Sequence, residues 1–323
     1  MGIGAPPPAA GALNGSVAGY RLIVVPYELG RLRDGVGNGP ERLLEAGAEA
    51  ALAASAAPVR RELVELDPAF NRTGRGEVDA CFELIRQVAG RVRAAVEDGA
   101  FPVVLSGSCF AGVGVVAGLT EPPPAVVWFD AHSDFNSPDT SIGGYFDGMG
   151  LAVLTGGAWQ AMHARVPGAR PVPESAVILA GARDFDPPEV LRLEASAVTH
   201  LRPEELGGLA GALAAISPAP SGVYVHVDLD VLDSDEARVN VYSAPGGPSG
   251  AELADLVGTV CRESPVRRSL LRRTTLASTP RPGCRRSRST CCGCSSSRVR
   301  RHPDTQSGPP SGGPLRRAAW DVW

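Results

Sequence analysis

The sequence of 323 residues contains no lysine, so all 31 of its basic residues are arginine. Lysine codons are rich in A, and their absence therefore indicates a gene of high G+C content rather than a chemical requirement. No apolar run approaches the ~20 residues that a membrane-spanning helix needs, which argues against a transmembrane segment. The first residues, rich in Ala, Pro and Gly, lack the basic start of a secretory signal. We therefore expect a disordered leader over residues 1–18 and a cytoplasmic protein.

Apolar runs that predict strands alternate with amphipathic segments that predict helices. This alternation is typical of parallel strands joined by helical crossovers, with helices on both faces of the sheet. No internal repeat is visible, and the length suits one large domain. We expect an α/β fold of three layers with a mainly parallel sheet over residues 19–265. The predicted strands cover 21–26, 59–66, 102–105, 125–129, 176–180, 198–201 and 223–228, and the predicted helices cover 40–54, 77–97, 112–119, 146–155, 188–195, 203–216 and 249–262.

Acidic residues follow two of the predicted strands directly. Residues 130–136 read Asp-Ala-His-Ser-Asp-Phe-Asn, and residues 228–230 read Asp-Leu-Asp. Ligands of an open parallel sheet bind outside the carboxyl ends of its strands. Hard divalent cations prefer oxygen ligands, and the histidine extends the choice to Mn, Fe, Co or Zn. Four carboxylates and one imidazole suit two metal ions, which Asp130 and Asp228 are placed to bridge.

These two motifs resemble those of the arginase/agmatinase/formiminoglutamase ureohydrolase family. The resemblance runs from about residue 21 to about residue 263, and its further matches are Gly39-Pro40, Gly148-Met149 and residues 181–187. It implies an arginase-like three-layer fold, a pair of divalent metal ions with Mn favoured, and a trimer or hexamer. The implied reaction cleaves a guanidino C–N bond and releases urea or a urea-like product. Neither a membrane nor a nucleic acid is expected as a partner.

The family pattern implies a role for each acidic residue of the two motifs. It implies Asp130 and Asp228 as bridging ligands, His132 and Asp230 as terminal ligands of one metal, and Asp134 as terminal ligand of the other and as acceptor of a hydrogen bond from the attacking hydroxide. A second histidine ligand belongs in the turn at residues 106–110, where this chain has Cys109. A thiolate there favours Zn, Fe or Co over Mn. Alternatively, Cys109 merely fills a buried turn.

The loop after the first motif also departs from the family. Asp147 stands where the family has a proton-shuttling histidine, and a carboxylate beside two cations is expected to have a low pKa. Gly143 and Tyr145 replace the residues that hold an amino-acid carboxylate in arginases, so a guanidino or hydroxyguanidino compound with another tail fits equally well. A formimino-type amidine hydrolase and a catalytically silent binding or assembly protein remain alternatives. The residues implied to contact substrate are Asn136, Asp186 and Glu189.

The last part of the sequence differs in composition from the rest. Residues 262–323 hold 14 arginines against three acidic residues, and residues 266–323 hold four of the seven cysteines. The segment is interpreted as a shifted reading frame, a disordered basic arm that binds nucleic acid, or a cysteine-rich metal tract. The codon table favours the first, because shifted codons here can encode Ala-Ala and Asp-Pro. The family's last core strand and a substrate-supporting glutamate belong after Glu263, and the sequence shows neither.

Overall fold

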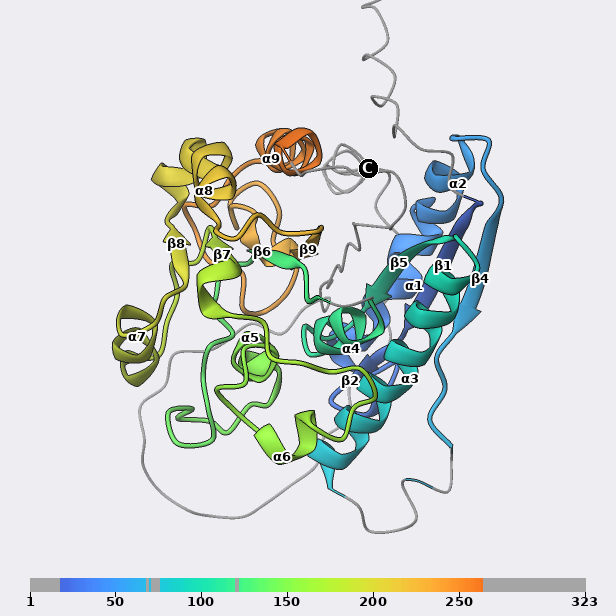
Figure 1. Ribbon diagram of the computed structural model, residues 1–323, viewed down its shortest axis with the longest axis horizontal. Helices are drawn as coiled ribbons and strands as arrows, with labels where there is room; N and C mark the ends of the chain where they lie inside the picture. Colours follow the sequence, from blue (N-terminus) through green and yellow to red (C-terminus); the bar gives the residue numbers. More distant parts are fainter. Residues whose placement is uncertain (1–17, 68–69, 71–75, 120–121, 264–323) are drawn as a thin grey trace, which may run out of the picture.

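Helices cover parallel strands on both faces, as the sequence predicts (Figure 1). The computed structural model of the chain describes residues 18–67, 70, 76–119 and 122–263. The strands of this part are β1 (Tyr20–Val25), β2 (Tyr27–Glu28), β3 (Arg31–Leu32), β4 (Val59–Leu63), β5 (Phe101–Ser106), β6 (Ala125–Phe129), β7 (Val177–Ala180), β8 (Thr199–Leu201) and β9 (Val223–Val227). The α-helices are α1 (Gly39–Glu45), α2 (Ala48–Ala53), α3 (Glu77–Glu97), α4 (Ala111–Gly118), α5 (Gly150–Leu154), α6 (Gln160–His163), α7 (Pro187–Glu194), α8 (Leu209–Ala215) and α9 (Gly250–Glu263). The 3-10 helices are η1 (Gly35–Asn38), η3 (Asp147–Met149), η4 (Glu174–Ala176), η5 (Pro203–Gly208) and η6 (Leu229–Val231).

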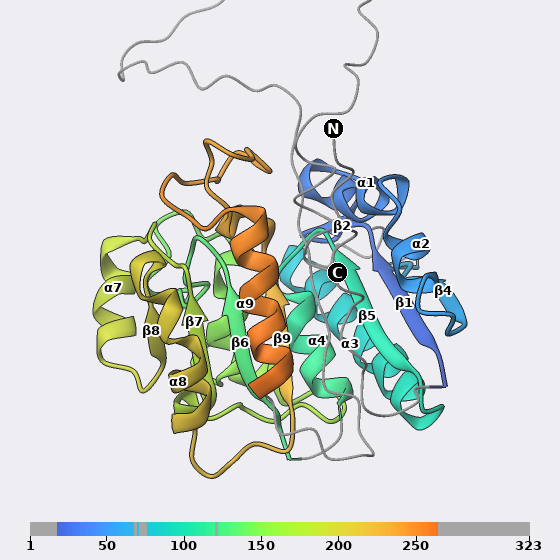
Figure 2. The same cartoon turned by 90° about the horizontal axis from the view of Figure 1, so that it is seen from above.

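The main strands form two parallel sheets, ordered β4-β1-β5 and β8-β7-β6-β9. Successive side chains of a strand face opposite sides, so β1 contributes to two cores. Ile23 and Val25 belong to the core that includes α3, α4 and α5, whereas Leu22 and Val24 belong to the core that includes α1, α2, α8 and α9. Figure 2 shows α8 and α9 in front of the β6–β9 strands and α3 and α4 behind the strands. The predicted three-layer α/β architecture is confirmed.

The inner edges of the two sheets, β5 and β9, face each other in both views (Figures 1 and 2). Within the described residues, neither edge pairs with a further strand. From the family resemblance we expect one more core strand after Glu263, in a segment that lies outside the described residues. The interpretations of residues 266–323 and of the leader before residue 18 lie outside them as well, so the domain boundaries stay predictions.

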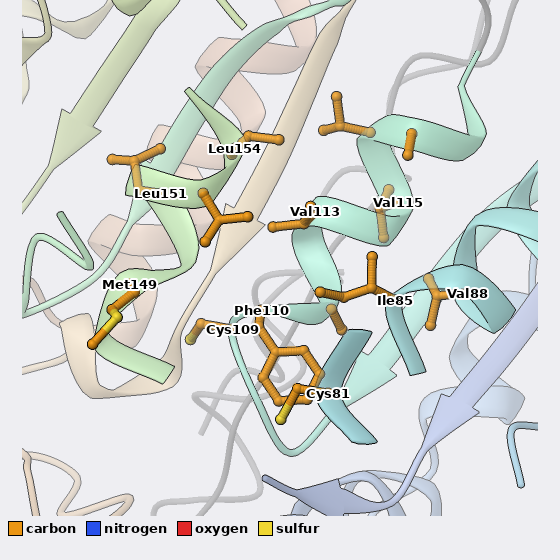
Figure 3. Packing of buried hydrophobic residues seen from close by; sticks show 14 of the residues in the cluster. Cys81, Ile85, Val88, Cys109, Phe110, Val113, Val115, Met149, Leu151 and Leu154 are labelled. Carbon is orange, nitrogen blue, oxygen red and sulfur yellow. The ribbon is translucent and has the colours of Figure 1, made fainter. Parts of the chain in front are cut away.

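The amphipathic segment over residues 77–97 forms α3 with both of its predicted ends. The single helix predicted over residues 40–54 is instead two helices, because Gly47 has a φ of 107°, outside the right-handed helical region. Figure 3 shows α3 packed closely against α4, with Ile85 beside Val113 and Val115. Gly114 permits this contact, since a Cβ there would lie 2.5 Å from the Ile85 carbonyl oxygen. None of the helices in the described part of the chain has the length and apolarity to span a bilayer.

Candidate metal centre

The pairing of β6 with β9 brings the two acidic motifs together. Phe129 lies opposite Val227 in the parallel register, so Asp130 and Asp228 follow at the same edge of the sheet. The Asp228 backbone N–H donates to the Phe129 carbonyl oxygen at 2.8 Å. The pairing of the two strands therefore continues one residue past β9, to the first carboxylate of the second motif. The sequence-predicted convergence of the motifs at strand ends therefore follows from main-chain geometry alone.

One group of side chains at this edge combines His132, Asp130 and Asp230. The His132 Nδ1 atom lies 3.3 Å from Asp130 Oδ1 and 3.5 Å from Asp230 Oδ2. The donor atoms of the three residues lie within 4.8 Å of one another, which is close enough to surround one cation after small side-chain movements. Asp228 is aimed at the same region, because its Oδ1 accepts a hydrogen bond from the Asp230 backbone N–H at 2.9 Å.

A second group lies around Cys109, in the turn between β5 and α4. The Cys109 Sγ atom is buried and lies 3.1 Å from Asp228 Oδ2. Figure 3 shows its sulfur directed away from the Phe110 ring and from Cys81. Asp134 is also buried and has a φ of 49°, and its Oδ2 atom has no hydrogen-bond partner in the part of the chain that the structure describes. A carboxylate held in a strained conformation with an unpaired buried oxygen is typical of a ligand site.

The predicted site residues share one cavity of about 510 Å³. Its lining includes all ten of them, namely Cys109, Asp130, His132, Asp134, Asn136, Asp147, Asp186, Glu189, Asp228 and Asp230.

The electrostatics of the cavity favour bound cations. Burial, with the negative charges of Asp130 and Asp147, raises the pKa of Asp134 well above its usual value. Burial and the charge of Asp130 raise the pKa of Asp230 to about 6. Burial opposes the charged form of His132, yet its hydrogen bond to Asp130 and the charge of Asp230 raise its pKa to about 10. Each shift reports an excess of buried negative charge, which divalent ions would neutralise. The donor set therefore fits the expected metals.

Asp147 lies in the wall of the cavity, where the family pattern has a histidine. Its Oδ1 accepts a hydrogen bond from the Phe110 backbone N–H at 3.1 Å, and the residue is 8% exposed. Burial, opposed by that hydrogen bond, and the charges of Asp228 and Asp130 raise its pKa to about 8. The sequence analysis predicts a low pKa for Asp147 because cations are expected nearby, whereas the surrounding protein groups alone raise this pKa. Metal binding is therefore expected to lower a pKa that the fold has raised.

The sequence model of the arginase family matches residues 18–267 of the chain. The chain belongs to the arginase family. It is 29% identical to an arginase of Bacillus subtilis over 235 residues, which cover 67% of this chain and 76% of that protein. It is 35% identical to an N(omega)-hydroxy-L-arginine amidinohydrolase of Streptomyces lavendulae over 140 residues, which cover 43% and 47% of the two chains. The structure of the Bacillus cereus arginase has a TM-score of 0.69 at 25% identity, and the match covers 80% of this chain and 90% of that one.

Membership of the arginase family supports a hydrolase of guanidino compounds at the level of the family. The fold resemblance extends to a formimidoylglutamase of Bacillus subtilis, with a TM-score of 0.60, 17% identity and coverage of 82% and 80% of the two chains. That likeness concerns the fold alone.

The three residues expected to contact substrate lie together at one side of the cavity. Asn136 Nδ2 donates to Asp186 Oδ2 at 3.3 Å. Glu189 is 3% exposed, and its carboxylate accepts hydrogen bonds from the Ser133 hydroxyl, from the Phe135 backbone N–H at 3.0 Å and from the Asp186 backbone N–H at 3.2 Å. These bonds tie the first motif to the start of α7. A direct contact of Glu189 with substrate stays a prediction.

Two residues of this arginase-family site carry contacts that the sequence analysis did not assign. Asn240 Nδ2 donates to Asp230 Oδ2 at 2.9 Å, from a loop with no recognisable motif. The Arg183 guanidinium joins two segments near the site, and its acceptors are the carbonyl oxygens of Gly181, Val231, Leu232, Ala244 and Pro245. Arg183 lies in the matched segment 181–187, so its position was visible in the sequence, although its role was not.

Proposed function

We propose that this protein is a binuclear metal-dependent hydrolase that cleaves the C–N bond of a guanidino or hydroxyguanidino compound. The observation that carries the proposal is the convergence of four buried motif carboxylates, His132 and Cys109 on one cavity. Two orphaned polar atoms support it, since Asp134 Oδ2 and His226 Nε2 are buried and have no hydrogen-bond partner among the described residues. Both observations are what a cation site built from side chains requires.

In this proposal, Asp130 and Asp228 would be shared between two ions. His132 and Asp230 would hold one ion, and Cys109 and Asp134 would hold the other. Two divalent ions held there would supply Lewis-acid chemistry that activates water near neutral pH. Mn is favoured by the family, whereas the Cys109 thiolate favours Zn, Co or Fe.

The acidic side chains of the cavity then position and move protons. The Asp134 Oδ2 atom, which has no partner within residues 18–263 as described, accepts a hydrogen bond from the attacking water. Asp147 lies in the same cavity wall, and its carboxylate relays a proton from the attacking water to the departing amine. Its Oδ1 is held by the Phe110 backbone N–H, which fixes the direction of the carboxyl.

The substrate end of the cavity is aromatic and polar rather than cationic. Tyr145 and Tyr242 line it with ring centroids 5.8 Å apart, and Asn136 and Asp186 lie in the same lining. These groups suit a cationic guanidinium, through charge-assisted hydrogen bonds and ring faces, and they suit an amino-acid carboxylate poorly. The proposed substrate is therefore a guanidino compound whose tail differs from that of free arginine.

Urea release is the direct test. The metal-free protein is loaded in turn with Mn, Co or Zn, and urea is measured with a panel of guanidino compounds. We expect urea from at least one pairing, and we expect Asp130→Ala and Asp228→Ala to lose both turnover and bound metal. Asp139→Ala, which removes an exposed carboxylate from the neighbouring loop, is the matched control. Full metal content in the Asp130 and Asp228 variants, measured by elemental analysis, would refute the site.

A catalytically silent protein with a binding or assembly role is the second candidate. Two substitutions, Cys109 and Asp147, favour it, as do the inner edges of β5 and β9, which have no partner strand within the described residues. Stoichiometric metal without urea from any pairing would support this candidate. The trimer or hexamer expected from the family is tested by analytical ultracentrifugation of the full chain, and a monomer would contradict it.

A further inference from the structure

We propose that His226 is a metal ligand, and that it forms with Cys109 and Asp130 a nitrogen–sulfur–oxygen site that prefers Zn or Co to Mn. The proposal deepens the proposed function and rests on its metal centre. It adds a ligand to the position of Cys109, the point at which the chain departs from the family pattern.

The position of His226 directs its side chain toward the cluster. It lies on β9 two residues before Asp228, so both side chains face the same side of the strand. The residue is completely buried, and among the described residues its Nε2 atom has no hydrogen-bond partner. Buried polar atoms of native proteins nearly always have a partner, and an orphaned nitrogen on a histidine grouped with Cys109 and Asp130 therefore points to a bound cation.

Two neighbours fix the orientation of the imidazole. The ring stacks on Trp128 with centroids 3.5 Å apart and an interplanar angle of 4°. Its Nδ1 atom lies 3.1 Å from the Tyr224 hydroxyl oxygen. When Nδ1–H donates to that oxygen, the lone pair is on Nε2 and is available to a metal. Trp128 also donates from Nε1 to Asp130 Oδ2 at 3.2 Å, so one residue orients two ligands of the site.

The donor atoms are close enough for a common ion. A sulfur of Cys109, a carboxylate oxygen of Asp130 and a ring nitrogen of His226 all lie within 4.8 Å of one another. Bond lengths of about 2.0–2.3 Å in a tetrahedral site separate its ligands by roughly 3.4–3.8 Å, so small side-chain shifts close the site. Asp228 Oδ2, 3.1 Å from the Cys109 sulfur, would be the fourth ligand, and Asp134 would be a fifth where the coordination expands beyond tetrahedral. Binding would release the thiol proton of Cys109.

This donor set changes the expected metal. Thiolate and imidazole are softer than carboxylate and select Zn or Co, whereas Mn prefers oxygen ligands. The position built on His132 and Asp230 keeps a donor set that is mainly oxygen. The two positions of one centre would thus differ in metal preference.

Cobalt spectroscopy of the full-length protein tests the proposal. The Co-loaded protein should show a thiolate-to-cobalt charge-transfer band and a strongly shifted imidazole N–H resonance. We expect Cys109→Ser to remove the band. We expect His226→Gln to remove one shifted imidazole resonance, that of His132 remaining, and to weaken binding of that ion by about 100-fold or more, since losing a ligand costs at least as much as losing the partner that supports one. Cys81→Ser and His163→Gln change a buried thiol and a buried imidazole elsewhere, and should leave both signals intact.

A second variant keeps the proposal testable if His226→Gln does not fold. Tyr224→Phe removes only the hydroxyl that contacts Nδ1, and is expected to weaken Co binding by about tenfold while the charge-transfer band remains. Unchanged affinity and an unchanged resonance in every folded variant of this pair would overturn the role of His226.

These readouts need no turnover, so the two proposals fail separately. A Co site with thiolate and His226 signals but no urea from any substrate would leave this inference standing and remove the catalytic function. Urea release together with unaltered Co binding in His226→Gln would refute the role of His226 and leave the proposed catalytic function standing.

Discussion

Asp147→Asn should make the metal-free protein less sensitive to alkaline pH. The buried carboxyl of Asp147 has its pKa raised to about 8, against an ordinary value of 3.8. A raised carboxyl pKa means that the folded state holds a proton that the unfolded state has lost. Stability is therefore greatest below the unfolded pKa and falls as pH rises through the folded pKa. Asparagine has no such proton, and its side-chain oxygen can still accept the Phe110 N–H.

The size of the expected loss of stability follows from the number of pH units between pH 6 and the Asp147 pKa of about 8. Between pH 6 and about pH 8, the wild type loses about 1.4 kcal/mol of stability per pH unit through this group, or about 3 kcal/mol by pH 9. His132, whose pKa is raised to about 10, also destabilises the folded state as pH rises. Its contribution is common to both proteins, because Asp147 is not among the groups that raise its pKa. The charge of Asp147 also raises the pKa of Asp134, so the difference between wild type and variant reports Asp147 together with the groups that its charge perturbs.

Urea denaturation in the presence of a chelator provides the assay. Free energies of unfolding are measured at intervals from pH 6 to pH 9 at constant ionic strength, with the buried Trp128 as fluorescent reporter. Asp139→Asn, in an exposed position, is the control and should follow the wild type. Equal pH dependence in wild type and Asp147→Asn, within about 1 kcal/mol, would refute the reasoning. Saturating metal should abolish the difference, because cations favour the carboxylate.

Three further substitutions test the contacts around the cavity. Asn240→Ala removes the amide bonded to Asp230 Oδ2 and should weaken metal binding by about 10–100-fold in chelator competition, so wild-type affinity would contradict it. Ser133→Ala leaves the buried Glu189 carboxylate without one donor and should cost about 1–3 kcal/mol in urea denaturation; no measurable cost would show that other donors suffice. Arg183→Met leaves several carbonyl oxygens unpaired and should cost roughly 3 kcal/mol or more, with faster proteolysis of the segment that follows Asp230. A melting temperature equal to that of the wild type would exclude this role for Arg183.

The strands and the motifs of this chain were predictable because their signals are local. The apolar runs before Asp130 and Asp228 end in polar residues, and parallel pairing then brings both ends to one edge. The α3 helix was predictable from its apolar periodicity over 21 residues. The break at Gly47 was not, because glycine within an Ala-rich helix is often tolerated and only the backbone φ shows the interruption.

The supporting contacts of the site were harder to predict, because they join residues distant in sequence. Glu189 was expected at the substrate, and the structure shows in addition that its carboxylate is bonded to the first motif across more than 50 positions. The Asp186-to-Glu189 spacing is that of a capping box at a helix start, a signal that the sequence analysis did not use. Asn240 has no such signal, since its partner Asp230 is reached through the fold of a loop.

Cys109 and His226 are best understood as one functional pair. A thiol in place of an imidazole softens one metal position, and taken alone it removes a neutral nitrogen donor and adds a negative charge to a cavity already rich in carboxylates. An imidazole on β9, oriented by Trp128 and Tyr224 and within reach of the Cys109 sulfur, supplies a neutral nitrogen to the same position. If the two residues act together, Cys109→His should not restore Mn preference unless His226 is also replaced. Metal selectivity of the double variant Cys109→His/His226→Ser, measured beside each single variant, separates a linked pair from two independent substitutions, because independent sites give additive effects.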